Sequence, residues 1–121
     1  MEKLELSKLK YPNMRDELIF YLDMLKKSDL DMDDNDLDYV IHFIFDDTAL
    51  GVDAKKEIGY FLCSNPEADL MNSLAKELDR VLDFYGTELH AHEYVQLPEW
   101  KNVASFADRA FKLINGGHEN L

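Results

Sequence analysis

Residues 29–48 have the sequence DLDMDDNDLDYVIHFIFDDT, a run of apolar residues with aspartate on both sides. The stretch holds eight aspartates and no lysine or arginine. Burying an unpaired carboxylate is costly, so a segment of this kind buries its middle and keeps its ends in water. We therefore expect residues 37–45 to form a helix buried most of the way round. Residues 29–36 are expected to form an exposed acidic linker in which Asp34 or Asn35 caps that helix.

Apolar residues at three- and four-residue spacing predict further helices on both sides of this segment. The predicted helices cover residues 13–27, 35–45, 53–63, 66–85 and 98–114. Gly86 is expected to end the fourth helix, and residues 115–117 the last one. Residues 87–97 suit either a short helix or an extended connection. We predict an all-α protein with a single compact bundle of five to six helices over residues 1–121, in which residues 1–11 and 116–121 are irregular.

Composition and charge narrow the possible partners. The chain has 121 residues, of which 46% are hydrophobic, and this is enough for one domain with its own core. Its 25 acidic and 13 basic residues give a net charge of −12. A field of this sign repels nucleic acid and anionic membranes, so we expect neither as a partner and favour a basic protein. The single cysteine excludes an intramolecular disulfide, and no signal peptide or membrane-spanning run is visible, which indicates a cytoplasmic protein.

The aspartates of the linker resemble the start of a calcium-binding EF-hand loop. Asp29, Asp31 and Asp33 alternate as the first ligands of such a loop do. The sixth position, which requires glycine, is Asp34, and the twelfth, which requires glutamate, is Val40. The pattern therefore fails at both diagnostic positions, and we predict no metal site here.

Two clusters of polar residues are compatible with catalysis. His42 and Asp46 stand four residues apart, a spacing at which the carboxylate can orient the imidazole, and Asp47 follows. No nucleophile or glycine-rich phosphate loop accompanies them, which favours a partly buried structural histidine. The second cluster is Glu88, His90 and His92, which point to one side only if that segment is extended. A small metal-dependent or His/Asp hydrolase is thus the alternative; we expect no cofactor and no catalytic residue.

Four short motifs carry a resemblance to a known group of proteins. They are Arg15-Asp16-Glu17-Leu18, His42-Phe43-Ile44-Phe45-Asp46-Asp47-Thr48, Ile58-Gly59 and Pro98-Glu99-Trp100. In this order they resemble a family of small acidic helical bacterial proteins with an FDDT core motif and a P-x-W start to the last helix. The resemblance covers residues 12–114. Such proteins are similar to immunity proteins encoded beside secreted bacterial toxins, including those of contact-dependent growth inhibition.

The resemblance implies a binding role and carries over no catalytic residue. We expect an immunity protein, a stoichiometric cytosolic inhibitor that binds a cognate toxin domain, such as a basic nuclease, through an acidic surface. The residues expected to form this surface are Asp29, Asp31, Asp33, Asp34 and Asp36, with Asp46 and Asp47 second because they can instead cap helices internally. A regulatory or scaffold domain with an unrelated partner remains a further alternative.

Overall fold

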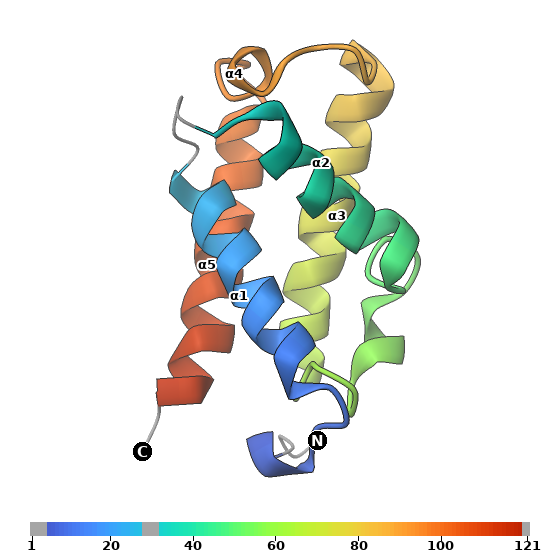
Figure 1. The fold of residues 1–121 in the computed structure, drawn as a ribbon, viewed down its shortest axis with the longest axis vertical. Coiled ribbons are helices and arrows are strands. Elements are labelled where there is room, and N and C mark those ends of the chain that lie inside the picture. The colour runs from blue at the N-terminus through green and yellow to red at the C-terminus, as the bar shows by residue number, and fades with distance from the viewer. Residues whose placement is uncertain (1–4, 28–31, 120–121) are drawn as a thin grey trace.

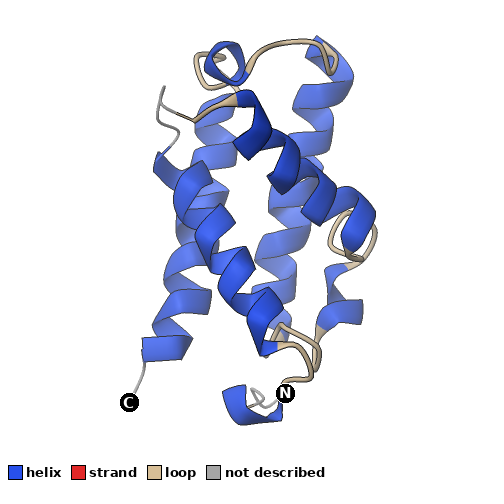
Figure 2. Cartoon of the chain, viewed as in Figure 1, coloured by secondary structure: helices blue, strands red, loops and turns tan. Residues whose placement is uncertain are grey.

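The computed structural model describes residues 5–27 and 32–119, so Asp29 and Asp31 lie outside the described residues. The described part forms five α-helices and no β-strand (Figure 2), which confirms the all-α prediction. The α-helices are α1 (Pro12–Lys27), α2 (Asp34–His42), α3 (Asn65–Tyr85), α4 (Ala91–Tyr94) and α5 (Trp100–Glu119). Shorter elements are the 3₁₀ helices η1 (Leu6–Lys8) and η3 (Ala54–Glu57) and the π-helix η2 (Phe43–Asp47), which continues α2.

The helices pack together in a compact bundle in which α5 contacts both α1 and α3. Both α1 and α3 pack against α5, and both run in the opposite direction to it (Figure 1). In that view α1 and α2 lie on the near side of the molecule, with α5 and α3 behind them, and α4 lies at one end. The segment α2–η2 therefore covers the bundle from outside rather than passing through it.

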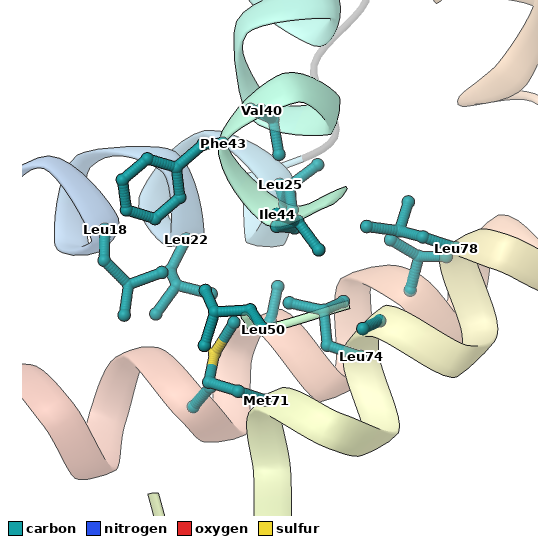
Figure 3. Packing of buried hydrophobic residues seen from close by; sticks show 14 of the residues in the cluster. Leu18, Leu22, Leu25, Val40, Phe43, Ile44, Leu50, Met71, Leu74 and Leu78 are labelled. Atoms are coloured by element: carbon teal, nitrogen blue, oxygen red, sulfur yellow. The ribbon is translucent and has the colours of Figure 1, made fainter. Parts of the chain in front are cut away.

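The apolar core joins these layers. Side chains from several helices face one another in it (Figure 3): Leu18, Leu22, Leu25, Val40, Phe43, Ile44, Leu50, Met71, Leu74 and Leu78. None of these ten side chains is more than 2% exposed, and burial of each contributes about 1.5–3 kcal/mol to stability. The apolar middle of residues 29–48 is therefore a core element, as its pattern predicts.

One side of α2 is more exposed than the sequence predicts. Tyr39 is 62% exposed, and His42 also faces solvent. The prediction that residues 37–45 are buried most of the way round is therefore wrong. A helix on the outside of a bundle contacts the core along one stripe only, and here Val40, Phe43 and Ile44 supply that stripe.

The prediction of a third helix over residues 53–63 is also wrong. Only Ala54–Glu57 is helical, as η3. Gly59 has a φ of 97°, a left-handed conformation that breaks a helix and that residues with side chains disfavour. The turn around Gly59 accepts hydrogen bonds from the start of the chain: the Lys10 amide donates to Gly59 O (3.0 Å) and the Tyr11 amide to Tyr60 O (2.7 Å). A contact with a distant segment thus outweighs the local helical pattern.

The remaining helices follow their sequence signals with small differences. Ser64 caps α3, and Gly86, with a φ of 84°, ends it as predicted. Within residues 87–97 the chain forms the short helix α4. The last helix begins at Trp100 and continues to Glu119, so the predicted end at residues 115–117 is wrong. Glycine lowers helix stability by about 1 kcal/mol without forbidding the conformation.

Candidate partner-binding surface

Asp33 and Asp36 cap the N-terminus of α2. The Asp36 amide donates to Asp33 Oδ1 (2.8 Å), and the Asp33 amide donates to Asp36 Oδ2 (3.3 Å). This reciprocal pair is a capping box, and it starts the helix one residue before the predicted cap at Asp34 or Asn35. Asp33 remains exposed and Asp36 is partly buried. The two carboxylates therefore stabilise the helix and also place negative charge at the surface.

Asp34 joins α2 to the distant helix α4. Its Oδ2 lies 2.8 Å from His90 Nδ1, and its Oδ1 accepts a 2.7 Å hydrogen bond from the Ala91 amide. The Ala91 amide and the His90 ring hold the pKa of Asp34 below its ordinary value. The Asp34 carboxylate in turn raises the pKa of His90. These residues are 56 positions apart, so spacing along the sequence gave no signal of the contact.

Thr48 forms the corner after η2, and the two aspartates before it face solvent. The Thr48 hydroxyl donates to Phe43 O (2.7 Å) and accepts from the Leu50 amide (3.2 Å). The Asp46 carboxylate pairs with His42 Nδ1, as their spacing predicts. The His42 side chain is 64% exposed, so the interpretation of a partly buried structural histidine is wrong. Asp46 and Asp47 are both exposed and cap no helix among the described elements.

Three solvent-accessible aromatic residues of α1 and α2, Phe20, Tyr21 and Tyr39, are called here the front aromatic face. Phe20 is 64% exposed, and its ring centroid lies 5.9 Å from that of Tyr21. Burial, the hydrogen bond to Glu17 and the nearby charges, Asp47 among them, raise the pKa of Tyr21 to about 12. Tyr39 was assigned to the core by its place in an apolar run, so the sequence pattern missed this face.

The Glu88, His90 and His92 cluster does not form a metal site. The His90 and His92 rings stack with centroids 5.7 Å apart and planes 6° from parallel. Throughout the described part of the chain, no group of three His, Cys, Asp or Glu side chains is placed to hold a metal ion. The short helix α4 instead starts at His90, whose amide donates to Glu93 Oε1 (2.8 Å). His90 and Glu93 therefore cap the N-terminus of α4.

A buried ion pair joins α1, α3 and α5. The guanidinium of Arg15 binds both carboxylate oxygens of Glu67 at 2.8 and 3.0 Å, and donates to the backbone oxygens of Phe61 and Ile114. Glu67 also accepts from the Cys63 amide (2.8 Å). Arg15 is 2% exposed and Glu67 1%. Because each of these contacts is internal, this pair connects three helices inside the fold and takes no part in a surface.

Two cavities lie at the end of the bundle near α4. The larger, about 320 Å³, is lined by Arg80, Val81, Phe84, Tyr85 and Glu99. Tyr85 Oη donates to Glu99 Oε1 (2.8 Å) across it. The smaller, about 110 Å³, lies between α2 and α4 and includes Asp34 in its lining. Each cavity holds titratable side chains, Tyr85 and Glu99 in the larger and Asp34 and Asp38 in the smaller.

Comparison with models of protein families assigns the chain to one family. A family model described as a domain of unknown function (DUF7945) matches residues 9–120. The chain belongs to the DUF7945 family. No curated protein and no solved structure matches this DUF7945 chain. Among its described helices, none combines the length and the apolar character needed to cross a membrane.

Proposed function

We propose that this protein is a non-catalytic, stoichiometric inhibitor that binds a basic partner protein through the face formed by α2 and η2. Residues 28–54 contain nine aspartates and no lysine or arginine. This stretch of exclusively negative charge is the observation that carries the proposal. Carboxylates gathered on one face raise the association rate with a positively charged partner and disfavour other partners.

The described carboxylates differ in what they contribute to this face. Asp46 and Asp47 lie on the exposed side and make no backbone contact that the fold needs. Asp33 and Asp36 are held by their capping box, and Asp34 by α4, which fixes their positions before any partner arrives. Because fixed charges lose little entropy on binding, this arrangement favours affinity.

The proposed identity of the partner rests on the resemblance described above. The FDDT segment and the Pro98-Glu99-Trp100 start resemble those of proteins similar to immunity proteins. We propose that the partner is a bacterial toxin domain, and that binding takes place in the cytoplasm, where the inhibitor must meet the toxin. A nuclease toxin fits best, because a groove that binds phosphates is basic and an acidic face can occupy it.

Co-production with a toxin domain encoded beside the gene tests the proposal. We expect a one-to-one complex on gel filtration and survival of cells that otherwise die. Replacing Asp33, Asp36, Asp46 and Asp47 with asparagine is expected to reduce both, while the helix cap is kept because asparagine caps as well as aspartate. Absence of a complex and of protection, with both proteins folded, would contradict the proposal.

A further inference from the structure

The front aromatic face has members on two helices, Phe20 and Tyr21 on α1 and Tyr39 on α2. Tyr21 of α1 meets Phe43 of η2 edge to face, with ring centroids 5.2 Å apart. Tyr39 lies about one turn before Phe43, on the exposed side of α2, and its contribution to the raised pKa of Tyr21 indicates that the two tyrosines are near each other. Phe20 borders Tyr21 on the other side. Single exposed apolar residues need no explanation, whereas neighbouring ones are candidates for an interaction site.

Tyr21 of this face packs against the buried ring of Phe43, which belongs to the core. Phe43 is 2% exposed and contacts Phe61, whose ring centroid is 5.9 Å away. The Tyr21 hydroxyl is fixed by a 2.7 Å hydrogen bond to Glu17. Aromatic residues that are already ordered lose little entropy on binding, which is why they dominate the energetics of many interfaces.

Lysine and arginine side chains lie close to aromatic rings at several places outside the front aromatic face. Lys10 Nζ lies 5.7 Å from the ring centroids of both Tyr11 and Tyr60. Lys26 lies over Phe111 and Arg109 over Phe106, each at 4.8 Å. Within the described residues no such cation lies over the front aromatic face, which is bordered by carboxylates instead.

We infer that the front aromatic face, with Glu17 and Asp47 beside it, receives an arginine side chain of the basic partner; this rests on the proposed function. The planar guanidinium of arginine stacks on aromatic rings and also binds carboxylates in a two-pronged manner. Lysine offers a compact and more strongly hydrated charge, so it gains less from the rings. The aromatic rings therefore favour arginine over lysine, whereas the aspartates alone distinguish only positive from negative charge.

Binding of short basic peptides to the full chain tests this inference. The probes are hexa-arginine and hexa-lysine with blocked ends, and the readouts are calorimetric affinity and amide shifts in NMR spectra. We expect shifts at residues 17–21 and 39–47 and an affinity for hexa-arginine about two- to fivefold above that for hexa-lysine. Replacing Phe20 and Tyr39 together with serine is expected to remove this preference.

Matched variants separate the rings from the charges. Phe84→Ser, at a ring 78% exposed on α3, and Tyr39→Phe are expected to keep the arginine preference. Equal affinities in the wild-type protein, or a preference that survives the loss of Phe20 and Tyr39, would overturn the inference. The acidic-surface proposal then still stands if Asp46→Asn with Asp47→Asn weakens both peptides. It fails if that pair has no more effect than Asp79→Asn with Asp83→Asn on α3.

Discussion

The Arg15–Glu67 ion pair is the strongest case of a residue whose role the sequence conceals. Each residue lies in an amphipathic helix, where a charged side chain is normally solvated. The two are 52 positions apart, so no helical spacing links them. The guanidinium satisfies two backbone oxygens and one carboxylate at once, which is what makes its burial tolerable.

Removing one partner of this pair should strongly destabilise the fold. We predict that Glu67→Ala lowers the free energy of unfolding by about 3–5 kcal/mol, because it leaves the Arg15 charge buried and unpaired. Urea denaturation measures the change. Asp108→Ala breaks an exposed pair with Lys112 (3.0 Å) and should cost at most about 1 kcal/mol. Similar decreases in the free energy of unfolding for the two variants would show that the buried pair matters no more than an exposed pair.

The contact of Asp34 with His90 predicts a pH dependence. The pKa of His90 is raised above 6.5, so its contribution to stability is present below pH 6.5 and lost as the pH rises through the raised value. The pKa of Asp34 is lowered from 3.8, so its contribution is present above pH 3.8 and lost as the pH falls through the lowered value. The contact of α2 with α4 is therefore strongest between pH 3.8 and 6.5.

An NMR titration of the His90 ring checks this contact. We predict that Asp34→Asn lowers the pKa of His90 toward 6.5, because the carboxylate that favours the charged ring is gone. Asp38→Asn, which removes a nearby charge on the same helix, serves as the control. The same His90 pKa in the wild-type protein and the Asp34 variant would contradict the hydrogen bond.

At the scale of elements, local periodicity predicted α1, α2, α3 and α5 because each buries one face against the core. It failed for residues 53–63, where hydrogen bonds from residues 10–11 hold Gly59 in a left-handed turn. No local pattern contains that information. The same limit applies to the candidate surface: the aspartates were visible as a run, whereas the exposure of Tyr39 depends on which side of α2 meets the core.

The Thr48 hydroxyl group joins the π-helix η2 to the turn that follows it. Thr48 Oγ1 donates to Phe43 O and accepts from the Leu50 amide, which closes the turn that leaves Asp46 and Asp47 exposed. We predict that Thr48→Val, which keeps the shape and removes the hydroxyl, lowers the free energy of unfolding by about 1–2 kcal/mol.

The chain's other threonine provides the control. Thr87 is exposed, so Thr87→Val should change stability by no more than about 0.5 kcal/mol. Both values come from chemical denaturation under the same conditions. Equal stability of the Thr48 variant and the wild-type protein would mean that the corner is held by packing alone.

At the scale of the whole molecule, charge is distributed unevenly. The net charge is −12, and the described residues 32–54 contain seven aspartates and no lysine or arginine. Helices α3 and α5 instead carry lysine and arginine among their acids, including Arg80, Arg109 and Lys112. The molecule therefore presents its strongest negative field on the side of α2, and a basic partner is steered toward that side.

The association rate with the toxin domain, measured by stopped flow over a range of ionic strength, tests this claim most directly. We predict a rate that falls steeply as salt is added, because salt screens the attraction between exposed charges. Asp46→Asn with Asp47→Asn should slow association at low salt by about two- to tenfold, and Asp79→Asn with Asp83→Asn should have a smaller effect. A rate that is indifferent to salt, and equal for the two double variants, would contradict the account.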